Sequence, residues 1–395
     1  MKTPEAAAGR GPILTSRAER ITPFMVMEIL ERAGELEKSG RSVVHLEVGE
    51  PDFPTPEVIV EAMRNALAKG VFGYTHSQGD PELREALAAH YKREYGVRVE
   101  PERFLVCPGT SIGLTLLFGA ILSPGDKVLI TNPHYACYPN FPRFFGGTPV
   151  YLDLHEEEGF LPDPDRVKRI LKREGRVKAL LLNSPANPTG AVIGADLLQA
   201  LAALPVFVIS DEIYHGLNYL EERDRSVLEF SDECAVVGGF SKAYAMTGWR
   251  VGYLLAPRSL AAPLRNIFQN FLISVNAAVQ KAAVAALEKA RPDVLKMRSV
   301  YAGRRRVLLD GLKNLGFGAA AEPAGAFYVM SNFKRLSLDS RSLSFRFLEE
   351  AGVGTAPGAD FGSGAEGFLR FSYAASKEDI LLGLERLGDF IKRSF

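Results

Sequence analysis

Residues 239–252 of the chain read GFSKAYAMTGWRVG, and they directly follow the short apolar run 235–238. We expect that run to be a buried strand, which places Lys242 just past the end of the strand and Arg250 eight residues later. Partial burial of a lysine lowers its pKa and frees the amine to form a Schiff base. Arginine offers a planar fork that fits a phosphate group. The alternative, two exposed surface cations, fits poorly with so many apolar and glycine neighbours.

Short apolar runs alternate with helical or loop segments on both sides of this stretch. Each run is apolar on both faces, which is typical of strands in a sheet that helices cover on both sides. Segment 251–256 follows Arg250 so closely that we expect it to pair antiparallel. The sequence therefore predicts an α/β fold with a mostly parallel sheet. The other predicted strands are 104–107, 127–130, 179–183, 206–209 and 235–238.

Two of these runs end in polar residues, at the edge where open α/β sheets bind their ligands. Asn187 lies in the loop SPANPTG (184–190), and Asp211 and Tyr214 lie in SDEIY (210–214). A carboxylate at the tip of a buried strand needs a partner that neutralises its charge, and a protonated pyridine nitrogen would be such a partner. The alternatives are an ordinary turn for Asn187 and a helix N-cap for Asp211.

A third polar group, Thr110 and Ser111, opens a predicted helix just after the run 104–107 and Gly109. Free backbone N–H groups and the helix dipole make such a position an anion site, although many helices begin this way without binding anything. Taken together, the three polar groups and Lys242 describe a site for a phosphorylated, cationic aromatic ring that a lysine binds covalently.

The length of 395 residues favours two packed units. We expect a flexible tail at 1–15, an N-terminal segment at 16–56 that joins the smaller unit, a large cofactor-binding domain at 57–290, and a small α+β domain at 291–395. In the first segment, 23–39 has helical spacing and 43–48 reads as a strand. Further helices are expected at 57–69, 80–95, 110–122, 274–290, 294–315 and 340–351, a strand region at 319–331, and a final strand and helix over 368–395.

Charge and cysteine content narrow the classes of function. The 47 acidic and 47 basic residues cancel, which argues against a general nucleic-acid or membrane-surface binder. The three scattered cysteines have no C-x-x-C spacing and suit a reducing compartment, with no metal site implied. No apolar run is long enough to span a membrane and residues 1–12 lack a secretory signal, so the sequence predicts a cytoplasmic protein.

One motif is a false lead. Residues 362–367, GSGAEG, satisfy the dinucleotide-binding pattern G-x-G-x-x-G. That pattern must follow a strand and open a helix, whereas here a loop precedes it and a predicted strand follows it. We therefore interpret 362–367 as a glycine-rich loop and disfavour an NAD-dependent oxidoreductase.

The quoted residues resemble the class I and II aminotransferases of fold type I, which bind pyridoxal phosphate. Residues 239–252 satisfy that family's lysine-attachment pattern, and the resemblance extends from about Ile21 to the last helix. Many members carry serine three residues before the lysine as a phosphate ligand. Here Gly239 stands at that position, so the phosphate has one donor fewer. The resemblance implies a homodimer with both active sites at the interface.

The resemblance also implies a role for each candidate residue. Lys242 would hold the cofactor as an aldimine and carry a proton in catalysis. The cofactor-binding residues would be Asp211 at the ring nitrogen, Asn187 and Tyr214 at the phenolic oxygen, Tyr135 stacked on the ring, Thr110, Ser111 and Arg250 at the phosphate, and Tyr74 reaching the phosphate of the neighbouring subunit. The substrate-binding residues would be Gly49, Asn187 and Arg370, and Arg370 would bind the substrate's α-carboxylate.

The implied reaction is transfer of the amino group of an L-amino acid to a 2-oxo acid, with 2-oxoglutarate as acceptor, by a ping-pong mechanism. Two alternatives stay open: a β-lyase or cyclopropane-forming synthase of the same fold, and a non-catalytic regulator. Some relatives select aspartate with a lysine early in the helix after the cofactor turn, where Ser111 matches best here. Because Phe24 and Tyr135 could offer an aromatic surface, we expect a neutral or aromatic amino donor.

Overall fold

The computed structural model describes residues 15–319 and 321–394, so the predicted tail at 1–15 lies almost entirely outside the described residues. Its centre is a seven-stranded sheet in which β8 runs opposite to the other six strands. The predicted α/β class and the antiparallel strand after Arg250 are both confirmed. In spatial order the strands are β2 (Phe104–Cys107), β8 (Gly252–Leu255), β7 (Ala235–Gly239), β6 (Phe207–Asp211), β5 (Val177–Asn183), β3 (Lys127–Asn132) and β4 (Thr148–Asp153).

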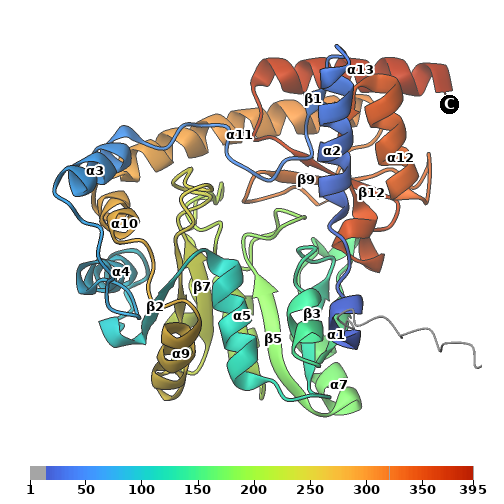
Figure 1. Cartoon of the computed structure of the whole chain (residues 1–395). Coiled ribbons are helices and arrows are strands. Elements are labelled where there is room, and N and C mark those ends of the chain that lie inside the picture. Colours follow the sequence, from blue (N-terminus) through green and yellow to red (C-terminus); the bar gives the residue numbers. More distant parts are fainter. Residues whose placement is uncertain (1–14, 320, 395) are drawn as a thin grey trace, which may run out of the picture.

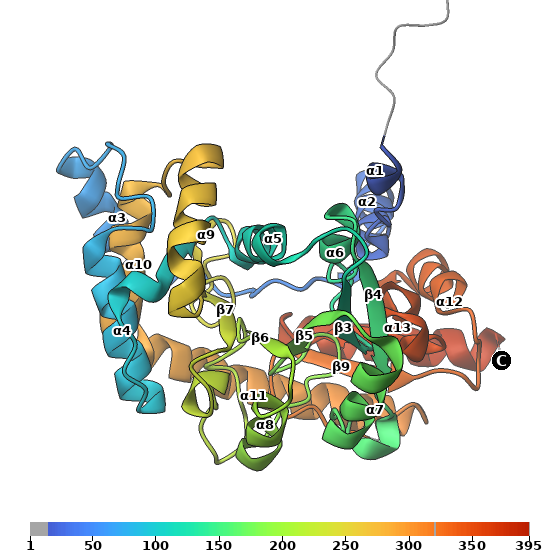
Figure 2. The same cartoon turned by 90° about the horizontal axis from the view of Figure 1, so that it is seen from below.

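Helices cover both faces of this sheet. Figure 2 shows α5 (Thr110–Ile121) and α9 (Arg258–Phe271) on one side, with α7 (Pro164–Glu174) and α8 (Ala195–Ala202) on the other. Beyond β2, three helices pack together: α3 (Glu57–Ala68), α4 (Pro81–Tyr95) and α10 (Ala277–Lys289) (Figure 1). The short α6 (Asn140–Phe144) follows β3.

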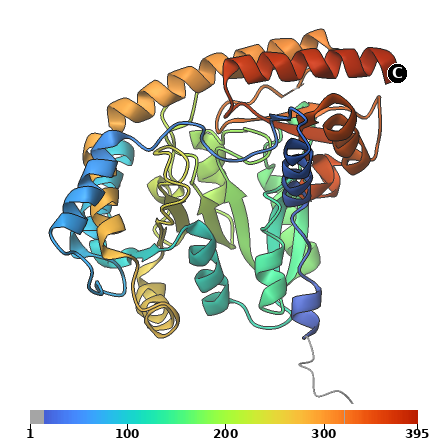
Figure 3. The same ribbon diagram turned by 45° about the horizontal axis from the view of Figure 1, so that its top comes forward.

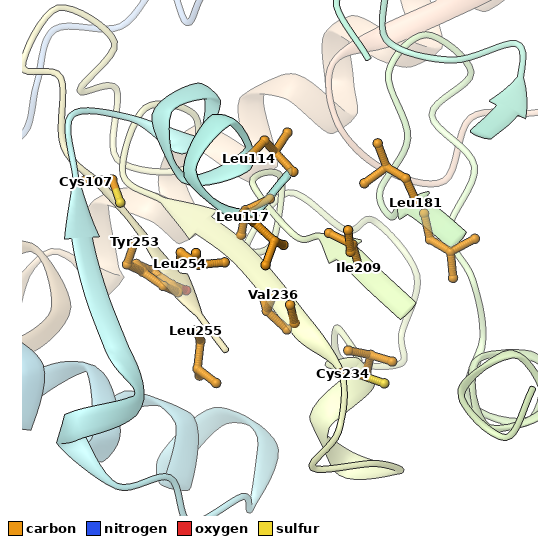
Figure 4. Close-up of a cluster of buried hydrophobic side chains, with 14 of the residues drawn as sticks. Cys107, Leu114, Leu117, Leu181, Ile209, Cys234, Val236, Tyr253, Leu254 and Leu255 are labelled. Carbon is orange, nitrogen blue, oxygen red and sulfur yellow. The ribbon is translucent and has the colours of Figure 1, made fainter. Parts of the chain in front are cut away.

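The core between α5 and the sheet is apolar throughout. Leu114 and Leu117 of α5 lie beside the central strands that carry Val236 and Leu254 (Figure 4), and all four side chains are at most 2% exposed. Burying one leucine stabilises the fold by about 2 kcal/mol. This packing fixes α5 against the sheet, and the helix begins beside the carboxyl ends of the parallel strands.

The C-terminal part is built on a second, smaller sheet. Strands β11 (Ala356–Pro357), β12 (Phe368–Ser372) and β9 (Tyr328–Asn332) form an antiparallel sheet. The long helices α11 (Arg291–Asn314) and α13 (Lys377–Ser394) lie side by side over it (Figure 3). This part also contains α12 (Ser340–Arg346), which a five-residue π-helical turn (Phe347–Ala351) continues.

The N-terminal residues join this smaller part. After α1 (Ser16–Glu19) comes α2 (Met25–Lys38), and β1 (Val44–His45) then pairs parallel with β10 (Val353–Gly354). The predicted boundaries at 56 and 290 fall between elements, before α3 and between α10 and α11. The exact division into domains stays a prediction.

Several predicted elements differ from the structure. Strand β4 was not predicted, because it lies at the sheet edge, is only partly buried and contains Pro149, which edge strands tolerate. Only Val44 and His45 of the predicted strand 43–48 are paired, and the predicted strand region 319–331 reduces to β9. Helix α10 starts at Ala277 rather than at 274, because the side chain of Asn276 caps it by accepting from the Val279 N–H at 3.1 Å.

Over the described ranges, no helix is both long and apolar enough to cross a bilayer.

Candidate active site

A cavity of about 710 Å³ lies at the carboxyl ends of β5, β6 and β7. Its walls come from distant parts of the chain: the residues before and within α2, the start of α5, the three strand ends, and β9 and β12. All the predicted site residues except Tyr74 line it, namely Gly49, Thr110, Ser111, Tyr135, Asn187, Asp211, Tyr214, Lys242, Arg250 and Arg370. The structure therefore brings together residues that the sequence could only place at separate strand ends.

Lys242 projects into this cavity from the turn that follows β7. Its Nζ donates to the backbone carbonyl of Gly49 at 2.6 Å, and the rings of Tyr214 and Phe327 lie 5.8 and 5.9 Å from it. Burial, helped by the nearby charge of Arg370, lowers the pKa of Lys242 to about 8. A larger fraction of this amine is therefore neutral and nucleophilic near pH 7 than in an exposed lysine.

Asp211 is the last residue of β6 and is only 4% exposed. Its carboxylate accepts from the Tyr138 hydroxyl at 2.7 Å and from the Ile213 N–H at 3.1 Å. Burial raises the pKa of Asp211 to about 6 in spite of these two hydrogen bonds. No side chain of the described ranges forms an ion pair with Asp211: the nearby His215 lies 3.6 Å from Glu212 instead, and the charges of His215 and Lys242 only partly offset the effect of burial on the pKa of Asp211.

Arg370 of β12 is 2% exposed and forms one side of the cavity. Its Nη1 donates to the Asn187 side-chain oxygen at 3.0 Å, and Nη2 donates to the backbone carbonyl of Glu47. The rings of Tyr328 and Phe361 pack on the guanidinium at 4.3 and 4.8 Å. Its Nε–H group is buried and has no hydrogen-bond acceptor in the part of the chain that the structure describes. A guanidinium held this firmly is suited to bidentate binding of a carboxylate.

Asn187 is itself held in place. Its backbone N–H donates to the side-chain oxygen of Asn183 at 2.7 Å, and the Asn183 amide donates to the Asp211 carbonyl at 2.9 Å. Asn183 ends β5, directly opposite Asp211 in the register of β5 and β6. A chain of hydrogen bonds thus links the end of β6 to Asn187, and from there to Arg370.

The start of α5 faces Arg250. The helix begins at Thr110, and Gly109 before it has no side chain with which to cap the first N–H groups. Arg250 has a positive φ of 55° and donates from Nη1 to the Thr247 carbonyl at 2.9 Å. A Cβ at Gly109 would collide with this guanidinium, so glycine allows the helix start and the cation to approach each other. The arrangement suits an anion.

Two more of the predicted residues shape the walls. Gly49 runs close to Tyr328, whose hydroxyl would lie 2.7 Å from a Cβ placed on Gly49. That same hydroxyl is 2.9 Å from the hydroxyl of Tyr214. Tyr135 is half-buried, with its ring edge-on to Phe24 at 6.1 Å.

Tyr74 is the exception. It is 83% exposed and lies outside this cavity; it lines a separate one together with Phe72 (73% exposed), Ser274 and Val275. Within one chain it cannot take part in the site. Its predicted role depends on a second subunit.

Sequence reasoning missed three side chains that contact predicted site residues. Tyr138 lies three residues after Tyr135, so its proximity to that ring could have been inferred. Asn183 ends a predicted strand next to Asp211 and could also have been found. No sequence pattern pointed to Tyr328, because nothing in the Ala- and Gly-rich stretch before it indicates that its ring packs on Arg370.

The glycine-rich loop 362–367 has a structural role. A short 3₁₀ turn (Ser363–Ala365) occupies it, the Gly364 N–H donates to the side chain of Asn132 at 2.9 Å, and β12 follows. In the described part of the chain, His, Cys, Asp and Glu side chains form no cluster of three or more that could hold a metal ion.

Known proteins resemble this chain over nearly all of its length. Residues 41–387 match the family model described as aminotransferase class I and II. The aspartate/prephenate aminotransferase of Thermus thermophilus is 41% identical over 96% of this chain and 99% of its own length. A (5-formylfuran-3-yl)methyl phosphate transaminase of Methanocaldococcus jannaschii is 38% identical over 96% of this chain and 100% of its own.

A solved structure gives the same result for the fold. Aspartate aminotransferase from Thermus thermophilus with maleate superposes with a TM-score of 0.91 at 40% identity, covering 96% of this chain and 100% of that one. The expected fold type I architecture is therefore confirmed.

Proposed function

This chain belongs to the class I and II aminotransferases, enzymes that use pyridoxal phosphate, and we propose that it moves the amino group of an L-amino acid to a 2-oxo acid in two half-reactions at one site. The observation that carries this proposal is the meeting of Lys242, Asp211 and Arg370 around one cavity. The three residues supply a nucleophilic amine, a carboxylate without an ionic partner and a fixed guanidinium.

The residues present fit pyridoxal phosphate. Asp211 is a buried carboxylate to which the described residues offer no ionic partner, and a pyridinium nitrogen is the cation that would balance it. The free N–H groups at the start of α5 and Arg250 form a cradle for a phosphate, which a side chain at Gly109 would fill. The lowered pKa of Lys242 suits covalent attachment to an aldehyde.

We assign the cofactor-holding residues as follows. Lys242 is the covalent anchor, Asp211 keeps the ring nitrogen protonated, and Asn187 and Tyr214 face the phenolic oxygen. Tyr135 covers the ring, while Thr110, Ser111 and Arg250 hold the phosphate. When bound, pyridoxal phosphate supplies the electron sink that makes the Cα–H bond of an amino acid acidic.

The protein's own groups then perform the rest of the reaction. Arg370 binds the substrate's α-carboxylate, assisted by Asn187, and so orients the Cα–H bond. The Nζ of Lys242 takes the proton from Cα, as its low pKa allows near neutral pH. Gly49 approaches the substrate by its backbone, with its carbonyl already holding Nζ at 2.6 Å.

The relatives bear on the alternative reaction classes. Because the similar proteins reported above are named aminotransferases or transaminases, transamination is favoured over the β-lyase, synthase and regulator alternatives. We propose 2-oxoglutarate as the acceptor. We also retain as proposals a cytoplasmic location and the division into 16–56, 57–290 and 291–395.

The side-chain end of the cavity is apolar. Phe24, Val26, Met27 and Leu30, from α2 and the residue before it, line it together with Tyr135. The only lysine and arginines among the described lining residues are Lys242, Arg250 and Arg370, and each already has a role. A second substrate carboxylate would therefore lack a cation from this chain. We propose a neutral or aromatic amino donor, although the Thermus relative is named for aspartate and prephenate.

A panel of donors tests this function. We expect measurable kcat/KM with 2-oxoglutarate as acceptor, and higher values for phenylalanine, methionine or leucine than for aspartate, because the wall is apolar. The measurement is kcat/KM for aspartate, alanine, phenylalanine, methionine and leucine under identical conditions. An aspartate preference above about 100-fold, or about 2.7 kcal/mol, would contradict the neutral pocket. No transfer from any of the donors would contradict the function itself.

We further propose that the enzyme is a homodimer with Tyr74 completing the neighbour's phosphate site. Leu67, Phe72 and Tyr74 are exposed and line a cavity of about 240 Å³, and exposed apolar surfaces of this kind are typical of subunit interfaces. In a two-fold dimer each chain would supply Arg250 to its own site and Tyr74 to its partner's.

Mixing two inactive variants tests the shared site. Hybrid dimers of Tyr74→Ala and Arg250→Ala contain one site that is wild-type at both positions. Random exchange of subunits should therefore restore about a quarter of the wild-type activity. The measurement is activity after the two variants are mixed under conditions that allow subunit exchange.

A matched control uses Arg250→Ala with Lys242→Ala, two residues of the same chain's site. Their hybrids contain no intact site, so this mixture should stay inactive. Failure of the first pair to complement, or full activity of a monomer in sedimentation at assay concentration, would refute the shared site.

A further inference from the structure

The first turn of α2 is capped by a residue from the far end of the chain. The N-cap residue Phe24 has an extended backbone and makes no side-chain hydrogen bond to the helix. Instead, the carboxylate of Asp360 accepts from the Met25 N–H at 3.0 Å through Oδ1 and from the Val26 N–H at 3.1 Å through Oδ2. A carboxylate on these N–H groups also interacts favourably with the helix dipole.

The 3₁₀ turn that contains Asp360 also contacts Arg370, the residue proposed to bind the substrate's α-carboxylate. Asp360 lies in the 3₁₀ turn Gly358–Phe361, between β11 and β12. The next residue, Phe361, is fully buried and packs its ring 4.8 Å from the guanidinium of Arg370. Two adjacent residues thus contact two different sides of the cavity. Phe361 packs on Arg370, the proposed anchor of the α-carboxylate, and Asp360 holds the start of α2, which carries the apolar side chains of the cavity wall.

Asp360 is a buried capping residue, unlike a helix cap on the protein surface. It is 7% exposed, and burial raises its pKa while the two backbone N–H groups act to lower it. On the other side, Thr22 donates from its N–H and hydroxyl to the Asn140 side chain, each at 3.2 Å. Phe24 therefore stands between two anchors, one on the large sheet's side and one on the C-terminal part.

The position of Phe24, Val26, Met27 and Leu30 in the cavity depends on where α2 begins. We propose that Asp360 is a positioning residue that fixes the start of α2 as the wall against which the donor's side chain packs. This inference rests on the proposed function. A donor with a bulky side chain uses the wall, whereas alanine, which ends at Cβ, does not reach it.

The experiment compares two donors in the holoenzyme of Asp360→Ala. We expect KM for phenylalanine to rise by about 10-fold or more with kcat within about 3-fold, and KM for alanine to change by less than about 3-fold. Asp360→Asn keeps the shape and one acceptor oxygen, so it should shift the ratio of the two KM values in the same direction by a smaller amount. It also serves as the variant to measure if the alanine substitution does not fold.

Asp339→Ala is the matched control. Asp339 is an exposed aspartate that caps α12 by accepting from the Ser342 N–H at 2.9 Å, and it does not line the cavity. Its loss should leave the ratio of the two KM values unchanged. Equal changes for both donors in the Asp360 variants, or no change in either, would overturn the proposal. A wild-type enzyme that transfers no amino group from either donor would instead contradict the proposed function.

Discussion

Lys242→Ala should lower turnover by at least about 10³-fold, about 4 kcal/mol of transition-state stabilisation. The substitution removes the covalent anchor and the proton acceptor in one step. In the structure no other lysine lines the cavity within the described residues, so no second amine can take over. The measurement is kcat at saturating amino acid, 2-oxo acid and pyridoxal phosphate, with thermal unfolding to check that the fold is retained.

The control for this variant is Lys242→Arg. It keeps the positive charge beside Gly49 and Tyr214 but carries no amine that can be neutral near pH 7. If the role of Lys242 is chemical, the arginine variant should be about as inactive as the alanine variant. Near-normal turnover in either variant would refute the assignment of Lys242.

Asp211→Ala should lower turnover by at least about 100-fold, about 2.7 kcal/mol at roughly 1.36 kcal/mol per decade. Without the carboxylate, the ring nitrogen should lose its proton near neutral pH, which weakens the electron sink. Asp211→Asn should have a similar effect, and it leaves a hydrogen-bond acceptor for the Tyr138 hydroxyl. The measurement is kcat at saturating cofactor. Unchanged turnover would exclude the pyridinium role.

Glu212→Gln is the matched control for Asp211. Glu212 is the next residue and is equally buried at 4%, but its carboxylate accepts from Ser226 and from the Val227 N–H, away from the cavity. A glutamine oxygen can accept the same two hydrogen bonds. We expect turnover within a few-fold of the wild type, which would separate the charge at the ring from the general cost of altering a buried acid.

The sheet could be predicted from the sequence because its strands are apolar on both faces and bounded by helices. Even the antiparallel β8 followed from its closeness to Arg250. Strand β4 could not be predicted, since its exposure at the edge and Pro149 remove the apolar pattern. The two-residue length of β1 could not be predicted either, because the strand is defined by its pairing with β10, 309 positions away, which no local pattern encodes.

The candidate site followed a similar rule. Residues that follow strands, such as Asp211 and Lys242, were placed correctly at one edge of the sheet because parallel strands end together there. Contacts that the C-terminal part makes with the rest of the molecule could not be predicted from the sequence. Examples are the hydrogen bond from Arg370 to Asn187 and the capping of α2 by Asp360, which join segments 183 and more than 330 residues apart.

The absorption spectrum of the purified protein with pyridoxal phosphate, compared between wild type and Lys242→Ala, tests the central claim most directly. We expect the wild type to show a visible band from the lysine-bound cofactor, and this band should be replaced by that of the amine form when an amino-acid donor is added. Lys242→Ala should show only free or loosely held cofactor. A wild-type spectrum without such a band, or the same band and the same response in Lys242→Ala, would contradict the claim that Lys242 carries the cofactor.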